Sequence, residues 1–282
     1  MVNTEPQSNG AVTVMALYRY PIKSCAGMAL DVAEIGARGF VHDREFMLVE
    51  PRSGLFFTQR ELPRMALIRP SVVGDLVTLG APEMSPFSAQ IVAEGPERDV
   101  VVWRDRCRAV DQGDAAAGWL SRFLGREVRL VRMAEDFSRS VNPDFAVDEG
   151  DEVGFQDGYP FLIISEESLA DLNARLAEPL PMNRFRPNIV VRGGGPFAED
   201  GWRRLRIGAV EFHLVKACAR CAITTTDQET AAVGREPLAT LATFRRVERG
   251  VLFGQNAIHA APGAIRRGDA VEVLERTPEP PR

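Results

Sequence analysis

Short runs of alternating apolar and polar residues cover most of this chain. Residues 11–20 and 210–214 place apolar side chains at every second position, which is the period of a half-buried β-strand. Between residues 57 and 110 similar runs follow one another closely, and this rhythm predicts a small antiparallel barrel or sheet. Strands are predicted at residues 11–20, 31–35, 46–50, 65–69, 72–79, 89–93, 100–103, 128–132, 161–164, 183–191, 210–214 and 268–274.

Two segments carry the longer period of an amphipathic helix. Residues 114–124 repeat apolar side chains at helical spacing, and Gly125 follows as an end signal. Ser165 precedes two glutamates and apolar residues at helical spacing up to residue 176, the pattern of an N-cap and the helix behind it. The chain is therefore expected to be a mixed, β-rich α+β protein with a few helices.

Length and charge narrow the class of protein. With 282 residues, of which 45% are hydrophobic, the chain can bury a large core and should form one large or two interleaved domains. The formal net charge is −5 at pH 7, and no block rich in lysine and arginine occurs. Nucleic acid is therefore not an expected partner.

The first ten residues and the four cysteines indicate the cellular compartment in which the protein is expected. Residues 1–10 are polar and lack the charged and apolar regions of a secretory signal, and no run of about 18 apolar residues could span a membrane. Four cysteines without a secretion signal favour reduced thiols over a disulfide framework. We expect a cytoplasmic protein without a membrane span.

The strongest candidate for chemistry is the segment 216–230, which reads KACARCAITTTDQET. It places Cys218 and Cys221 three positions apart, directly after a predicted strand. The thiolate is the form of cysteine that binds metals and acts as a nucleophile, and it needs positive charge nearby. Lys216 and Arg220 would supply that charge, so one of the two thiols is the candidate reactive group.

Other interpretations of this cysteine pair remain open. It could be half of a zinc site, but the other two cysteines, Cys25 and Cys107, lie far apart in the sequence, and there are only three histidines. A thioredoxin-like redox pair opens a helix, which the β-branched residues 224–226 disfavour. The four short polar side chains of residues 224–227 are well suited to hydrogen-bond an anionic ligand. Two ordinary buried thiols are the third alternative.

Two further segments carry cationic side chains that could hold an anion. In YPIKSCAG, residues 20–27, Lys23 and Ser24 follow a strand end, where the turn can bind a phosphate or simply be solvated. In GFVHDREFML, residues 39–48, Arg44 carries a planar guanidinium. That group suits a phosphate or a pterin edge, or an ion pair with a neighbouring acid.

These segments resemble those of the MOSC domain family, the molybdenum-cofactor sulfurase C-terminal family, whose members include the amidoxime-reducing proteins. The resemblance covers about residues 11–275, with the motifs in the family's order. The segments that carry it are KACARCAITTTDQET, YPIKSCAG, GFVHDREFML, DGYPFLIISEESLADLN, FRPNIV and LFGQ.

The resemblance implies a binding site for the molybdenum cofactor, which is molybdopterin carrying molybdenum. The second cysteine of the family's run is the molybdenum ligand, so Cys221 is the implied metal ligand and catalytic residue. The implied cofactor contacts are Lys23, Ser24, Arg44, Gly158, Tyr159, Arg186, Asn188, Ala219, Arg220 and Asn256. Arg186 and Asn188 are two apart in a predicted strand, so both should face one ligand. Ala219 and Tyr159 depart from the small hydroxyl residue and the small residue that relatives carry there.

The resemblance also implies a domain organisation. An N-terminal MOSC β-barrel-like domain is expected at residues 11–120, a MOSC β-barrel domain at residues 121–276, and a disordered tail at residues 277–282.

The activity that the resemblance implies is the reduction of N-hydroxylated compounds by a molybdenum-cofactor-dependent oxidoreductase. No ferredoxin-type cysteine cluster follows residue 275, so the electrons should come from a separate protein: a ferredoxin, a flavodoxin, or a cytochrome b-type protein with its reductase. The alternative is a protein that carries persulfide sulfur or the cofactor itself.

Overall fold

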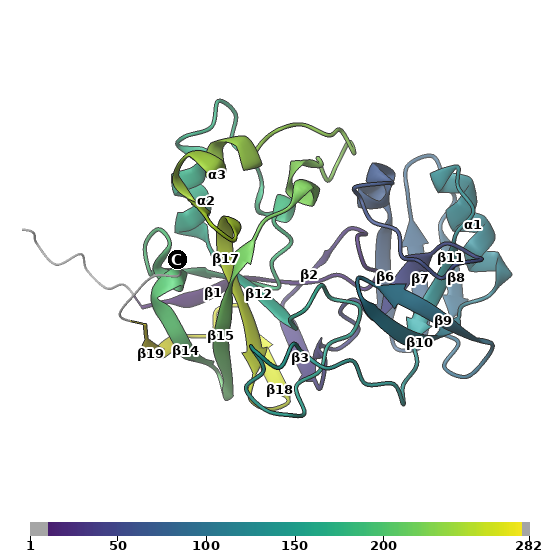
Figure 1. Cartoon of the computed structure of the whole chain (residues 1–282), viewed down its shortest axis with the longest axis horizontal. Helices are drawn as coiled ribbons and strands as arrows, with labels where there is room; N and C mark the ends of the chain where they lie inside the picture. Colours follow the sequence, from purple (N-terminus) through teal and green to yellow (C-terminus); the bar gives the residue numbers. More distant parts are fainter. Residues whose placement is uncertain (1–10, 278–282) are drawn as a thin grey trace, which may run out of the picture.

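The computed structural model describes residues 11–277, and they form two lobes (Figure 1). One lobe holds strands β5 to β11 and helix α1, and the other holds a large sheet with helices α2 and α3. The expected β-rich α+β architecture is confirmed.

A nine-stranded sheet forms the centre of the second lobe. Eight of its strands lie in the order β19-β14-β15-β17-β12-β13-β1-β2, and β16 pairs with β17. Neighbours in this order are antiparallel except β12 and β13. The strands are β1 Thr13–Arg19, β2 Met28–Leu30, β12 Phe161–Ser165, β13 Ile189–Arg192, β14 Trp202–Ile207, β15 Val210–Ala219, β16 Arg246–Val247, β17 Gly250–His259 and β19 Val271–Arg276.

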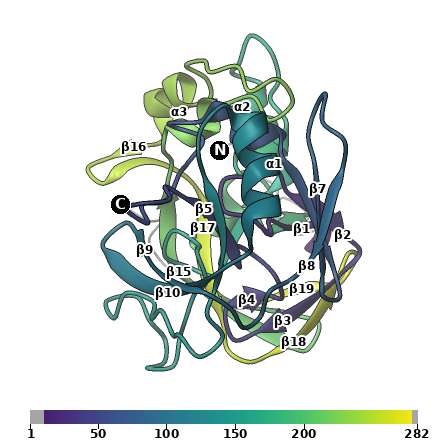
Figure 2. The same ribbon diagram turned by 90° about the vertical axis from the view of Figure 1, so that its right-hand side faces the viewer.

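Smaller antiparallel sheets make up the rest of the described strands. Their orders are β5-β11-β10-β9, β6-β7-β8 and β18-β3-β4. The helix α1 covers the outer side of the first lobe (Figure 2). The strands are β3 Val32–Gly36, β4 Gly39–Phe40, β5 Phe46–Val49, β6 Arg69–Val73, β7 Leu76–Gly80, β8 Phe87–Gln90, β9 Glu97–Val102, β10 Asp105–Asp111, β11 Arg129–Met133 and β18 Gly263–Arg266.

Each lobe has its own apolar core. In the second lobe, Phe161 from β12 packs edge-on against Phe40 and Phe212, with ring centroids 5.0 and 5.3 Å apart. In the first lobe, Phe46 and Leu120 are fully buried between the sheets and α1. Burying a large apolar side chain contributes about 1.5–3 kcal/mol, so these two clusters hold the lobes that frame the site.

The two predicted helices are confirmed, and the residues predicted to end the first and begin the second do so. Helix α1, Asp114–Leu124, ends at Gly125, which adopts the left-handed conformation with φ +64° and so serves as a C-cap without a Cβ clash. Helix α2, Glu166–Asn173, begins after Ser165, whose hydroxyl accepts a hydrogen bond from the Ser168 N–H. A third helix is α3, Leu238–Phe244.

Two predicted strands are wrong in the first lobe. Residues 65–69 lie mostly in a 3₁₀ helix, Pro63–Leu67, because the fixed φ of proline suits the first helical position. Residues 72–79 are not one strand, because Gly74 at φ +54° turns the chain between β6 and β7.

Strands from the two sequence halves pair with each other. β1 pairs with β13 and β3 with β18, and α1 contains residues 120 and 121, on either side of the predicted division. The division into residues 11–120 and 121–276 stays a prediction. Residues 1–10, and the predicted tail apart from Thr277, lie outside the described residues. Among the described helices, none has the length and apolar character needed to cross a membrane.

Glu199 is a fully buried acid beside the junction of β12 and α2. Its Oε1 accepts hydrogen bonds from the Ser165 N–H at 3.1 Å and the Ser168 hydroxyl at 2.8 Å, while its Oε2 has no partner among the described residues. Burial raises the pKa of Glu199 above its ordinary value, because the charged form loses its hydration.

Replacing Glu199 with glutamine should therefore change how stability depends on pH. Below the pKa of glutamate in the unfolded chain, about 4.3, Glu199 is protonated in both states and does not reduce the stability of the wild type. As the pH rises through the higher pKa of the folded state, ionising the buried carboxyl lowers the free energy of unfolding. Urea unfolding between about pH 4 and 8 should show the wild type losing stability relative to Glu199→Gln as pH rises. Parallel curves for the two proteins would contradict the ionisation of a buried Glu199.

Candidate functional site

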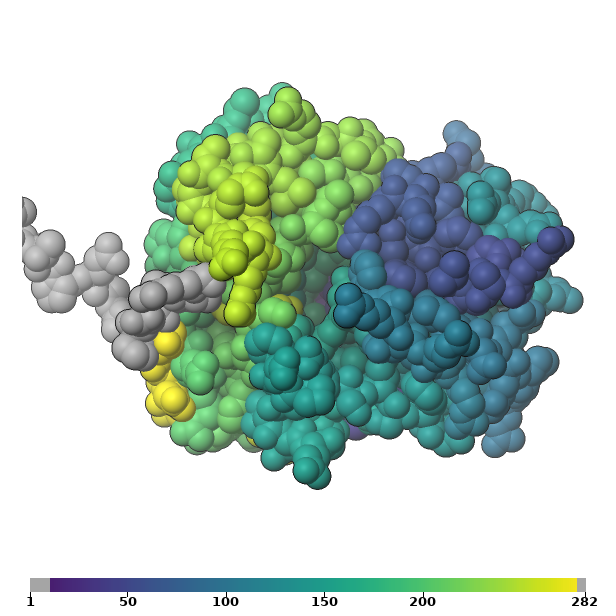
Figure 3. Space-filling model, in the orientation of Figure 1, coloured from purple at the N-terminus to yellow at the C-terminus, as the bar shows by residue number. Residues whose placement is uncertain are grey.

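A cavity of about 310 Å³ lies between the two lobes. Figure 3 shows the surface hollowed between the purple-to-blue residues of the first lobe and the green residues of the second. All the predicted site residues line this cavity: Lys23, Ser24, Arg44, Gly158, Tyr159, Arg186, Asn188, Ala219, Arg220, Cys221 and Asn256. The structure thus brings them together, while the role of each in binding a cofactor stays a prediction.

The two thiols of the predicted loop both reach the cavity. Cys218 lies near the end of β15, and Cys221 precedes a 3₁₀ helix, Ala222–Thr225; both are partly exposed. Arg220 Nη1 donates to Cys218 Sγ at 2.9 Å, whereas Arg60 Nη2 donates to Cys221 Sγ at 3.1 Å.

The charge beside Cys221 therefore comes from the first lobe, contrary to the expectation that Lys216 and Arg220 supply it. Arg220 is engaged by Cys218, and the Lys216 ammonium lies 4.2 Å from the centroid of the Phe145 ring. Sequence position could not reveal this, because Arg60 is brought to the thiol by packing between the lobes.

The other two thiols are not available for chemistry. Cys25 and Cys107 are buried, and burial raises the pKa of Cys25 to about 12 and that of Cys107 to about 11. Both stay protonated near neutral pH, so they cannot act as thiolates.

The polar residues 224–227, which were expected to hydrogen-bond an anionic ligand, do not line the cavity and bond to groups of the protein. The hydroxyls of Thr224 and Thr225 donate to the carbonyls of Cys221 and Ala222 at 2.9 and 2.8 Å. Asp227 accepts hydrogen bonds from the loop and pairs with Arg184 at 3.0 Å. Short polar side chains satisfy nearby backbone groups in this way, and here they fix the shape of the cysteine loop.

Lys23 is a buried ammonium at the wall of the cavity. It donates to the Phe155 carbonyl at 2.7 Å and pairs with Asp157 Oδ1 at 2.5 Å. Burial lowers the pKa of Lys23, and the Asp157 carboxylate counteracts this. Although desolvation opposes its ionisation, Lys23 and the indole N–H of Trp103 hold the pKa of Asp157 well below its usual range. Asp157 is therefore a fixed anion whose side chain is 61% exposed.

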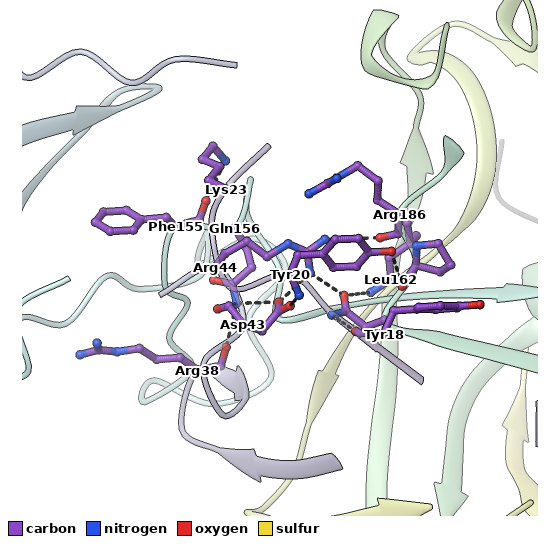
Figure 4. A network of polar contacts seen from close by, with 12 residues as sticks. Tyr18, Tyr20, Lys23, Arg38, Asp43, Arg44, Phe155, Gln156, Leu162 and Arg186 are labelled. Carbon is purple, nitrogen blue, oxygen red and sulfur yellow. Dashed lines mark hydrogen bonds and ion pairs between the residues drawn. The ribbon is translucent and has the colours of Figure 1, made fainter. Parts of the chain in front are cut away.

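The guanidinium groups of Arg44 and Arg186 both lie against the Tyr20 ring, within a network of polar contacts (Figure 4). Their guanidinium carbons lie 4.2 and 4.3 Å from the centroid of the Tyr20 ring, a cation–π geometry. Burial raises the pKa of Tyr20 above its ordinary range, so its hydroxyl stays neutral and donates to the Pro187 carbonyl at 3.0 Å. Tyr20 thereby keeps two like charges close together.

Asp43 and Asn188 fix the orientation of the Arg44 guanidinium by accepting its hydrogen bonds. Arg44 Nη1 donates to Asp43 Oδ2 at 2.6 Å and to Asn188 Oδ1 at 3.0 Å, and the Asp43 carboxylate also accepts from the Tyr20 N–H at 2.8 Å. Arg44 thus forms the ion pair that one alternative predicted and also lines the cavity, while its contact with a phosphate or pterin stays a prediction.

The prediction that Arg186 and Asn188 face one ligand because they lie two apart in a strand is wrong about the strand. Both precede β13, which begins at Ile189, so no strand period applies to them. Arg186 instead has φ +57°, and its side chain donates to the Cys25 carbonyl at 2.6 Å. A loop, not a strand face, brings the two side chains to the cavity.

Three residues that line the cavity have strained backbone conformations. Ser24, Arg44 and Arg186 have φ values of +65°, +46° and +57°, in the left-handed region that side chains with a Cβ rarely adopt. Each such residue costs about 1–3 kcal/mol and persists only where the surroundings enforce it. Strain at three lining residues points to a preorganised binding site.

The remaining predicted residues shape the wall without charge. Asn256 lies opposite Lys216 in the β15–β17 pair, and Tyr159 packs edge-on against Phe145 with centroids 6.0 Å apart. Gly158 faces open space, and Ala219 contributes only its methyl group. The missing hydroxyl at Ala219 leaves this part of the wall apolar.

The cavity fits an anionic, phosphate-bearing cofactor. Its charged lining is cationic apart from one acid: Lys23, Arg44, Arg60, Arg186, Lys216 and Arg220 against Asp157. Arg220 Nε is buried without a hydrogen-bond partner in the described part of the chain, as expected for a donor that awaits a ligand. Within residues 11–277 no three histidine, cysteine or acidic side chains gather as a metal site, so a metal here would need ligands from a cofactor beside the Cys221 thiolate.

Three residues of the site were missed by sequence reasoning. Arg60 and Asp157 carried no signal beyond their charge, and Tyr20 was placed at the end of a predicted strand. An aromatic residue next to a proline and a basic loop could have marked Tyr20, but the positions of Arg60 and Asp157 depend on tertiary contacts.

Replacing Gly27 with alanine should loosen this site. An added Cβ would lie 2.4 Å from Tyr20 Cε1, so the ring that carries Arg44 and Arg186 must shift. We expect a loss of about 1–3 kcal/mol, as for overpacking in a well-packed core, measured by urea unfolding. Gly158→Ala is the matched control, because its Cβ would meet nothing within 4 Å and should change stability by less than about 0.5 kcal/mol. Equal effects of the two substitutions would contradict the packing role of Gly27.

Comparison with known families and proteins gives matches along nearly the whole chain. A family described as the MOSC N-terminal beta barrel domain matches residues 11–127, and the MOSC domain matches residues 150–272. The chain is 38% identical over 286 residues to mitochondrial amidoxime-reducing component 1 of Homo sapiens, covering 93% of this chain and 83% of that protein.

Two further relatives extend this picture. Mitochondrial amidoxime reducing component 2 of Bos taurus is 39% identical over 277 residues, covering 92% of this chain and 82% of that protein. Molybdenum cofactor sulfurase of Solanum lycopersicum is 33% identical over 261 residues, covering 83% of this chain but only 32% of that longer protein.

Proposed function

The chain belongs to the MOSC family, with the N-terminal β-barrel domain and the MOSC domain in succession, and from this premise we propose that it binds the molybdenum cofactor and reduces N-hydroxylated compounds. The observation that carries the proposal is the single cavity in which cationic side chains surround one accessible thiol pair. The names of the relatives in Homo sapiens and Bos taurus, which specify amidoxime reduction, support the reaction class.

Different residues of the cavity would bind different parts of the cofactor. Lys23, Arg44, Arg186 and Arg220 would neutralise the cofactor's phosphate and hydrogen-bond its pterin, and Ser24, Asn188 and Asn256 would add neutral polar contacts. Cys221 would be the protein's metal ligand, with Arg60 donating to its sulfur. When bound, the cofactor supplies two-electron redox chemistry, while the protein orients it and tunes its surroundings.

The overall reaction breaks the N–O bond of the substrate. The substrate accepts two electrons and two protons, its oxygen leaves as water, and the product is the corresponding amine or amidine. The electrons would come from a separate redox protein such as a ferredoxin, a flavodoxin or a cytochrome b-type protein. Asp157, held ionised beside Lys23, can accept a hydrogen bond from a substrate N–H but does not supply a proton near neutral pH.

A second candidate function is the carriage of persulfide sulfur or of the cofactor. The observation that favours it is the partly exposed thiol of Cys221 beside a cation, together with the match to a molybdenum cofactor sulfurase. A carrier would hold sulfane sulfur on Cys221 and would not turn over N-hydroxylated compounds.

The deciding experiment is purification from a host that makes the cofactor, followed by elemental analysis and turnover. We expect near-stoichiometric molybdenum and reduction of benzamidoxime to benzamidine with a chemical electron donor. Protein without molybdenum but with sulfane sulfur on Cys221 would overturn the reductase proposal in favour of the carrier. The cytoplasmic location expected from sequence stays a prediction, and the amidoxime-reducing relatives in Homo sapiens and Bos taurus are named as mitochondrial.

A further inference from the structure

The first lobe contacts the cysteine loop, residues 216–230, through a tight turn at residues 58–61 that reads TQRE. The Thr58 hydroxyl accepts a hydrogen bond from the Arg60 N–H at 3.2 Å, and the Glu61 carboxylate accepts one from the Thr58 N–H at 3.2 Å. This exchange has the form of a capping box, in which a threonine and a glutamate three positions later bond to each other's part of the backbone. The turn is fixed by its own side chains, so the position of one residue in it determines the position of the next.

A buried pair of amides joins this turn to the second lobe. Gln59 Nε2 donates to the Ser24 carbonyl at 2.8 Å and to Gln228 Oε1 at 3.1 Å. Gln228 Nε2 donates back to Gln59 Oε1 at 3.0 Å and to the Thr226 carbonyl at 2.9 Å. Both glutamine side chains are buried, and both N–H groups of each amide are bonded. Such a pair holds one geometry, because a displacement would leave buried polar groups without partners.

The residue after Gln59 contacts the candidate thiol. Arg60 Nη2 donates to Cys221 Sγ at 3.1 Å, and the Arg60 guanidinium carbon lies 5.0 Å from the centroid of the Trp103 ring. Arg60 is exposed, and an exposed arginine has many rotamers, so ordering its side chain costs conformational entropy. Its contact with the thiol therefore depends on a backbone that is held at a fixed distance from the cysteine loop.

We propose that Gln59 and Gln228 are positioning residues for Cys221. Their amide pair keeps the 58–61 turn against the cysteine loop and thereby keeps Arg60 at hydrogen-bonding distance from Cys221 Sγ. The inference rests on the proposed function, in which Cys221 is the metal ligand, and it applies equally to a carrier that uses the same sulfur. Hydrogen bonds to a ligand sulfur alter the properties of the bound metal, so the amide pair controls the surroundings of this sulfur without touching it.

The first test is hydrogen–deuterium exchange of the cofactor-free chain, which needs no turnover. Gln59→Met and Gln228→Met each remove the amide pair, one from either lobe, and should speed exchange of the backbone amides at 226–234 by about fivefold to tenfold. Exchange in helix α1 should not change, which shows that the variants are folded. Arg69→Gln is the matched control, because it removes only an ion pair with Glu229 in which both side chains are 67% exposed. Unchanged exchange at 226–234, or equal acceleration in α1, would overturn the proposal.

The second test asks whether the amide pair acts through Arg60. In protein loaded with the cofactor, Gln59→Met should shift the absorption spectrum of the bound cofactor in the same direction as Arg60→Gln. The double variant should show little more than the shift of Arg60→Gln alone, because both substitutions remove one and the same hydrogen bond. Additive shifts, or no shift in Gln59→Met, would refute positioning through Arg60. If the protein binds no molybdenum, the proposed reductase function fails, while the exchange measurement still decides whether the amide pair holds the cysteine loop.

Discussion

Replacing Cys221 with serine should remove most of the molybdenum from protein purified from a cofactor-producing host, and reductase activity with it. A thiolate is the form of cysteine that binds metals, serine offers only a hydroxyl in its place, and the other thiol of the cavity is engaged differently, because Cys218 accepts from Arg220. Loss of an outer-shell partner alone typically costs about 10–100-fold in metal affinity or activity, so loss of the ligand itself should cost at least as much.

The measurement is the molybdenum-to-protein ratio by elemental mass spectrometry, with the absorption spectrum of the bound cofactor as a second readout. Cys107→Ala is the matched control, since it removes a thiol that is buried in the first lobe away from the cavity and should leave the metal content unchanged. Full metal content with an unaltered spectrum in Cys221→Ser would show that this thiol is not a ligand.

Replacing Arg44 with methionine should destabilise the protein by about 3–5 kcal/mol, the usual cost of removing one partner of a buried ion pair. The Asp43 side chain is completely buried and that of Arg44 is 13% exposed. The substitution leaves the Asp43 carboxylate without its cation. It also removes a guanidinium from the Tyr20 ring, so the same variant should bind less cofactor.

Urea unfolding of the cofactor-free protein measures this effect separately from ligand binding. The double variant Asp43→Asn with Arg44→Met should recover much of the lost stability, because a neutral amide in place of Asp43 no longer needs a cation. It should not recover cofactor binding, because the guanidinium is still absent. A double variant no more stable than Arg44→Met would show that the loss comes from packing and not from the uncompensated charge.

The site is assembled across the two lobes, and this links stability to binding. Lys23 and Arg60 come from the N-terminal half, whereas Asp157 and Cys221, which they contact, come from the C-terminal half. A substitution that shifts the lobes relative to each other should therefore impair the site without touching its residues.

Several local elements could be predicted from the order of residues alone. Residues 114–124 form a helix that ends at Gly125, and Ser165 caps the next one, because helical spacing and capping depend on neighbouring residues alone. Alternation of apolar residues likewise marked β1 and β15. Resemblance of motifs then selected eleven residues that all line one cavity.

The contacts between side chains of the site could not be predicted in this way. Arg60 donates to Cys221, Lys23 pairs with Asp157, and the Trp103 indole N–H donates to Asp157. Such contacts join positions more than fifty residues apart (Trp103 and Asp157 are separated by 54), and nothing in local spacing encodes them. These contacts form because loops of the two lobes, each with its own apolar core, lie against each other. Which charges pair therefore depends on how the lobes pack and not on the order of residues along the chain.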